Sequence, residues 1–134
     1  MATWNKFQSW AETMVEVANL GTDQFVIALT NTAPIATNGV LADLTQISYT
    51  NLSSRNLTTA SSSQTGGSYT LVFNDLVLTA SGAVGPFRYV VVYDDTPTSP
   101  ADPLVGWWDY GSSITMANAE TFTIDFTGAA ITLS

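Results

Sequence analysis

The apolar residues near the start of the chain recur at spacings of three and four, which is the period of an α-helix. The stripe consists of Trp4, Phe7, Ala11, Met14, Val15 and Ala18, and Gly21 follows as a residue suited to end a helix. We therefore predict one N-terminal helix over about residues 4–18, packed on the rest of the fold through this stripe. Trp10 lies beside the stripe and indicates a contact surface, because interfaces are enriched in tryptophan.

After Gly21 the pattern changes to the alternation that is typical of β-strands. The segments 31–39 (NTAPIATNG) and 61–68 (SSSQTGGS) have the Pro, Asn, Gly and Ser residues of loops. The predicted strands cover 24–30, 43–50, 55–60 (the weakest), 69–80 with a bulge at 74–75, 87–93, 104–110, 120–127 and 130–133. About eight short strands separated by turns predict an antiparallel β-sandwich, jelly-roll-like or Ig-like. The prediction is thus a mainly β, single domain over 1–134, with one N-terminal α-helix and the sandwich over about 22–134.

Two of these strands, 87–93 and 104–110, flank the loop 94–103 (DDTPTSPADP), whose prolines cannot extend a central strand. They therefore predict a hairpin in which residue 93 pairs with residue 104. In that register Arg88 lies opposite Asp109, and Gly106 lies opposite Val91 and leaves room among large neighbours. An arginine within an otherwise apolar strand needs a partner, so we predict a structural ion pair between Arg88 and Asp109. The alternative is that each side chain faces solvent or an external partner.

The adjacent tryptophans in LVGWWDYG (104–111) raise the question of a ligand platform. Neighbouring side chains on a strand point to opposite faces, so Trp107 and Trp108 cannot form one stacking shelf. One should belong to the core, and the other should lie beneath the helix, a loop or another subunit. Trp108 and Tyr110 do share a face, which keeps a sugar-binding platform as an alternative, although core aromatic residues are commoner.

The net charge of −8 arises from eleven acidic residues and only three basic ones, Lys6, Arg55 and Arg88. Three scattered cations cannot displace counterions from nucleic acid or hold an anionic membrane. Charged residues make up only 10% of the chain, so its surface must be largely uncharged and polar, which suits contact with other proteins. The start of the chain lacks the pattern of a secretory signal, and no stretch is apolar enough to span a membrane.

Candidate catalytic chemistry is sparse. The chain has no histidine and no cysteine, and the sequence contains none of the nucleophile or phosphate-binding motifs, so we expect no enzyme, no catalytic residues and no cofactor. Asp94, Asp95 and Asp102 carry the oxygen ligands that calcium takes, but without an EF-hand pattern. The sequence leaves calcium binding by the loop 94–103 open.

Three stretches, taken together, carry a family resemblance. They are NKFQSWAETM…NLGTDQFVIALTNTAPIATNGVLADLTQIS, the central GPFRYVVVYDDT, and PLVGWWDYGSSITMANAETFTIDF. The chain resembles a family of small proteins encoded in tailed-bacteriophage genomes, among the virion structural genes near the major capsid protein. The likeness covers nearly the whole chain, except that the turn 116–119 (MANA) lacks an expected glycine.

The resemblance implies a capsid decoration (cement) protein on the outer face of the capsid, made in the host cytoplasm, with the major capsid protein and neighbouring copies of itself as partners. The candidate contacts are Trp4, Phe7 and Trp10 together with the loops 31–39, 61–68 and 94–103. The alternative is a tail or baseplate module that binds a host surface, such as a glycan, through Trp108, Tyr110 and the acidic loop.

Overall fold

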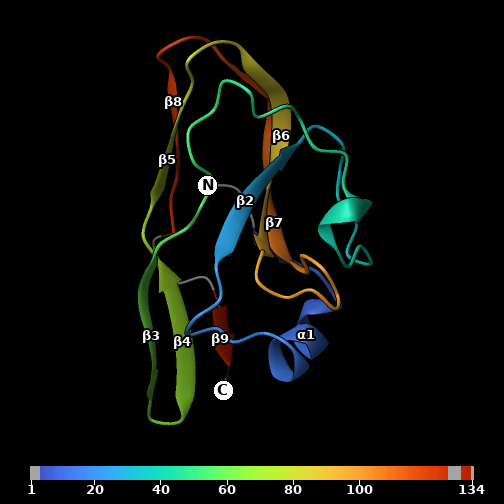
Figure 1. Ribbon diagram of the computed structural model, residues 1–134, viewed down its shortest axis with the longest axis vertical. Helices are drawn as coiled ribbons and strands as arrows, with labels where there is room; N and C mark the ends of the chain where they lie inside the picture. Colours follow the sequence, from blue (N-terminus) through green and yellow to red (C-terminus); the bar gives the residue numbers. More distant parts are fainter. Residues whose placement is uncertain (1–3, 127–130, 134) are drawn as a thin grey trace.

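The computed structural model describes residues 4–126 and 131–133 of the 134-residue chain (Figure 1). It is mainly β, with antiparallel sheets and one α-helix, which confirms the predicted fold class; the sandwich arrangement stays a prediction. The elements are β1 (Trp4–Lys6), α1 (Trp10–Glu16), β2 (Phe25–Thr30), the 3-10 helix η1 (Leu41–Asp43), β3 (Thr59–Thr65), β4 (Ser68–Phe73), β5 (Leu76–Thr79), β6 (Val84–Asp94), β7 (Leu104–Met116), β8 (Thr121–Ile124) and β9 (Ile131–Leu133). The predicted strands 120–127 and 130–133 extend into residues 127–130, which lie outside the described residues.

The strands form three antiparallel sheets (Figure 1). The largest has the order β1-β7-β6-β2, and the two smaller ones have the orders β3-β4-β9 and β5-β8. Strands β4 and β5 follow each other in the chain but belong to different sheets. The predicted bulge at 74–75 is therefore the point where the chain crosses from one sheet to another.

Both faces of the central part of the four-stranded sheet, β2 with residues 89–94 of β6, are buried, as the doubly apolar sequence of β6 predicts. Val90 and Val92 belong to the larger hydrophobic cluster, which contains residues of all three sheets. Val91 and Tyr93 point to the opposite face and belong to a smaller cluster, covered in part by the loop leucines Leu41 and Leu44. The sheet is thus the central layer, with strands on one side and a long loop on the other.

The predicted helix over about 4–18 is wrong in its first half, because Trp4–Lys6 form strand β1 at the edge of the sheet. A spacing of three places two side chains on one face of a helix but on opposite faces of a strand. Trp4 contacts Trp108 in the larger cluster, whereas Phe7 contacts Trp107 in the smaller one. The pattern was compatible with both structures, and pairing with β7 selected the extended one.

The helix that does form, α1, is seven residues long and buries only part of the predicted stripe, since Met14 packs against the larger cluster. Its buried residues are Trp10 and Thr13, whereas Val15 of the predicted stripe is 71% exposed. Trp10 and Thr13 are three residues apart, so they share the face that meets the sheet.

The β6–β7 hairpin begins in the predicted register and then shifts. Tyr93 pairs with Leu104 as expected, but Val105 is an extra residue in β7, so Tyr89 and not Arg88 lies opposite Asp109. The same bulge places Gly106 opposite Val92. The bulge changes the partner of each residue by one position, so Tyr89 lies opposite Asp109, where the predicted register placed Trp108.

The segment 61–68, predicted as a polar loop tip, is mostly strand. Strand β3 continues to Thr65, and only Gly66 and Gly67 form the turn to β4, with φ angles of +59° and +90°. Two successive residues with positive φ define a type I′ turn, which glycine adopts without strain. Conversely, the predicted strand 43–50 is loop. It is joined to β2 by an isolated β-bridge between Gln46 and Thr30 and by further hydrogen bonds, such as the one that Leu29 N donates to Tyr49 Oη at 2.9 Å.

Candidate functional site

Strand β7 places its two tryptophans on opposite faces of the sheet, as predicted. The Trp107 ring lies 4.5 Å from the Phe7 ring in the smaller cluster. The Trp108 ring lies 4.6 Å from Trp4 and 5.4 Å from Phe126, in edge or tilted contacts at the larger cluster. Such contacts between aromatic rings contribute about 0.5–1.5 kcal/mol each beyond the area they bury. The pair therefore holds two layers together from one short stretch of strand.

The predicted ion pair between Arg88 and Asp109 is present, although the register that suggested it is wrong. Arg88 Nε donates to Asp109 Oδ1 at 2.7 Å, and Nη2 donates to Oδ2 at 3.1 Å. The Gly111 N–H also donates to Oδ1 at 2.8 Å. These donors, the Arg88 guanidinium first, hold the pKa of Asp109 below its usual range. Both side chains are more than a third exposed, so the pair fixes local geometry on a solvated surface.

The candidate contact residues do not form one exposed surface. Phe7 is 0% exposed and Trp10 is 2% exposed, so neither can contact a partner without rearrangement, and their assignment as contacts is wrong. Trp4, Trp108 and Tyr110 are half-buried and pack against the larger cluster. Helical spacing had suggested an accessible flank for Trp10, but α1 turns this residue toward the sheet.

The proposed sugar platform is engaged within the fold. Tyr110 lies 5.1 Å from Phe122 between ring centroids, and Trp108 contacts both Trp4 and Phe126. Rings that are held by such neighbours have less open face for stacking on a sugar. The common face of Trp108 and Tyr110 is therefore a packing surface in this fold.

The acidic loop has one unusual member. Asp94 is fully buried, and Thr96 N donates to its Oδ1 at 3.2 Å. In the part of the chain that the structure describes, no group donates a hydrogen bond to its Oδ2. Burial, and then the nearby Asp23 carboxyl, raise the pKa of Asp94 to about 8. Asp95, by contrast, is exposed. Within residues 4–126 and 131–133, no group of three or more His, Cys, Asp or Glu side chains could hold a metal ion.

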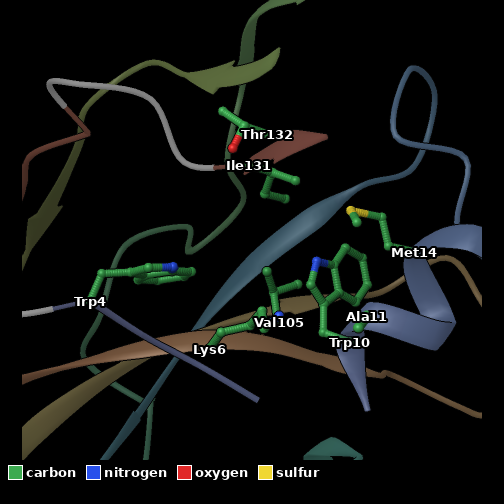
Figure 2. A pocket seen from close by; sticks show the side chains of 8 residues that line it. All are labelled: Trp4, Lys6, Trp10, Ala11, Met14, Val105, Ile131 and Thr132. Carbon is green, nitrogen blue, oxygen red and sulfur yellow. The ribbon is translucent and has the colours of Figure 1, made fainter. Parts of the chain in front are cut away.

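A cavity of about 370 Å³ opens between β1, α1, β7 and β9 (Figure 2). It is lined by Trp4, Lys6, Trp10, Ala11, Met14, Val105, Ile131 and Thr132. Figure 2 shows the indoles of Trp4 and Trp10 on opposite sides, with Ile131 above and Val105 below. The indole nitrogen of Trp10 lies on the ring edge that faces this space. It is buried, and no described residue accepts a hydrogen bond from it.

Sequence reasoning missed this cavity because its walls come from separate segments of the chain. Met14 lies four residues after Trp10, which is a helical spacing, but nothing links either residue to 131–132 before the fold is known. Sequence reasoning also missed Arg55, whose Nη1 donates to Ile27 O at 2.6 Å while the guanidinium covers the Tyr49 ring at 3.7 Å. Arg55 thus attaches the loop before β3 to the central sheet.

Comparison of the chain with protein-family models, with curated proteins and with solved structures finds no match. None of the helices among the described residues has the length and apolar character needed to cross a membrane.

Proposed function

We propose that this chain is a non-enzymatic structural protein of a tailed-bacteriophage virion, namely a capsid decoration protein. It would bind the outer face of the major capsid protein lattice, beside neighbouring copies of itself, and stabilise the head. The sequence resemblance described above supplies the family context. The physical character of one surface supports a role in contacts between proteins.

That surface is the β3–β4 hairpin, and its lack of charge is the observation that carries the proposal. Every residue of β3 is exposed, and no charged residue occurs from Asn56 to Asn74 in a chain of net charge −8. Among the described strands only β4 pairs with β3, so its outer edge is open (Figure 1). Natural proteins usually guard such an edge with charges, proline or bulges, and β3 has a bulge near Ala60 but neither of the others.

An open, uncharged edge is a liability for a free protein and an asset for one that is covered in an assembly. Ser, Thr and Gln side chains can hydrogen-bond a neighbour without the cost of desolvating a charge. Each contact of this kind is modest, but a decoration protein repeats it over a whole lattice. The summed contacts would oppose the outward pressure of packaged DNA.

The first test is the copy number and location of the chain in purified virions. Quantitative mass spectrometry should find the chain in hundreds of copies, in proportion to the major capsid protein. A dozen copies or fewer would instead indicate the tail or baseplate alternative, and absence from the particle would refute the proposal.

A second test uses the hairpin itself. The pair Ser61→Glu and Ser63→Glu places two charges on exposed positions of β3 and should abolish binding to capsids that lack the protein. A matched control, Ser112→Glu with Thr123→Glu, adds the same charge at exposed strand positions outside the hairpin and the candidate contact loops and should bind normally. Equal loss of binding in both variants would indicate a general charge effect and contradict a role for the hairpin.

A further inference from the structure

The cavity beside α1 combines apolar walls with a small set of polar groups. The aromatic and aliphatic walls are Trp4, Met14, Val105 and Ile131, and the cavity volume of about 370 Å³ lies at the lower end of the ~300–1,000 Å³ range of small-molecule sites. Such walls suit a flat, apolar body of one or two rings, which could lie against the Trp4 indole.

The polar groups of the cavity are dominated by donors. Lys6 carries an ammonium group, Trp10 has an indole N–H, and Thr132 has a hydroxyl, and no Asp or Glu is among the described residues that line the space. This is unusual in a chain with eleven acidic residues and only one lysine. The electrostatic preference of this lining is for an acceptor or an anion, opposite to that of the protein as a whole.

The Trp10 N–H is the strongest single sign of a ligand. The residue is 2% exposed, and its Nε1 has no hydrogen-bond acceptor within residues 4–126 and 131–133. An unsatisfied buried donor costs about 1–3 kcal/mol, and buried tryptophans usually find a partner. Figure 2 shows this nitrogen facing the cavity between the two indoles, where a ligand atom could accept the bond.

We infer that this cavity binds a small planar aromatic carboxylate. The ring system lies against Trp4, one carboxylate oxygen accepts from Trp10 Nε1, and the Lys6 ammonium neutralises the charge at the rim. Because Nε1 is itself buried, the acceptor reaches it only when a wall side chain moves, and Met14 is unbranched and adaptable. The inference does not depend on the proposed virion role, since it rests only on the lining of the cavity.

The test is a titration of the ¹⁵N-labelled full chain with 2-naphthoate, followed through the indole N–H signals of its four tryptophans. Trp10→Phe identifies the Trp10 signal. Saturable shifts of the Trp10 and Trp4 signals are expected, whereas Trp107, on the opposite face of the sheet, should not move. 2-Naphthamide has the same ring system without the charge and should bind more weakly.

Two variants separate specific binding from nonspecific contact with apolar surface. Lys6→Met should weaken 2-naphthoate binding by at least about threefold, since a partly solvated ion pair contributes modestly, and should leave 2-naphthamide binding unchanged. Ala11→Leu fills the cavity and should abolish binding of both probes. Val15→Leu adds the same kind of bulk on the exposed side of α1 and should have no effect.

Each contrary result overturns the inference. These results are the absence of saturable shifts at millimolar probe, equal affinity for the acid and the amide, and equal binding by the Ala11→Leu variant. The dispersion of the amide spectrum verifies that each variant is folded, so lost binding cannot be confused with lost structure.

Discussion

Because Asp94 is buried, we expect its contribution to the free energy of unfolding to fall as pH rises toward neutrality. Its pKa is about 8 in the folded state, because burial and the nearby Asp23 disfavour the charged form, against 3.8 for an ordinary aspartate. Between these two values the folded chain retains a proton that the unfolded chain has released. The free energy of unfolding contributed by this group is therefore greatest below the unfolded-state pKa and is lost as pH rises toward the folded-state pKa.

The perturbation that tests this reasoning is Asp94→Asn. Asparagine keeps the acceptor for the Thr96 N–H and replaces the unpartnered Oδ2 with an uncharged amide that can donate toward Asp23. Between the unfolded-state pKa and pH 7, a span of about three pH units, the wild type loses free energy of unfolding through Asp94. At about 1.4 kcal/mol per unit the loss reaches up to ~4 kcal/mol. The variant should therefore be more stable than the wild type by about 1–4 kcal/mol at neutral pH, and nearly equal to it at about pH 4.

Urea unfolding, followed by tryptophan fluorescence over this pH range, measures the difference. The matched control is Asp95→Asn, which removes a carboxylate from the exposed neighbouring position and so accounts for the change in net charge alone. Two results would refute the reasoning. One is a pH profile of Asp94→Asn that runs parallel to that of the wild type, and the other is a stability gain of the variant over the wild type that is smaller at neutral pH than at pH 4.

Three further substitutions test the packing, each by the same unfolding assay. Gly106→Ala should destabilise by about 1–3 kcal/mol, because the new Cβ would lie 2.2 Å from Trp4 Cζ2 and 2.7 Å from a backbone oxygen; an unchanged stability would contradict the close contact of β1 with β7. Ala119→Gly should stabilise by about 0.4–1 kcal/mol, because Ala119 has a φ of +70° that glycine adopts without strain; a loss of stability would contradict this turn geometry. Trp10→Ala should lower the free energy of unfolding by about 3–5 kcal/mol, because the side chain is buried, whereas Val15→Ala on the exposed side of the same helix should change it very little. Similar losses in both variants would contradict the observed orientation of α1.

The sequence predicted those features that depend on alternation along a single strand. The burial of β6 on both faces and the opposite placement of Trp107 and Trp108 follow directly from period two. The missing glycine in the turn 116–119 also has a structural counterpart, because Ala119 adopts the conformation that glycine prefers. These features are local, so no knowledge of the partner strands was needed.

Features that depend on which segments meet were not predictable in the same way. Trp4–Lys6 became a strand only because the edge of β7 was available to pair with it. The exposed polar sequence of β3 resembles a loop in composition, yet pairing with β4 and the Gly66-Gly67 turn make it a strand. The cavity joins α1 to β9 across more than a hundred residues. The Arg88–Asp109 pair forms although the predicted register is wrong, and the β6–β7 ladder shifts a second time between Phe87 and Tyr89, beside Arg88.

The most direct test of the proposed function is a density map of the intact virion that carries this protein. A decoration protein requires density for the mainly β fold on the outer face of the capsid lattice, with the β3–β4 hairpin against the major capsid protein or a neighbouring copy. Density for the chain in the tail, or a capsid surface without it, would contradict the account.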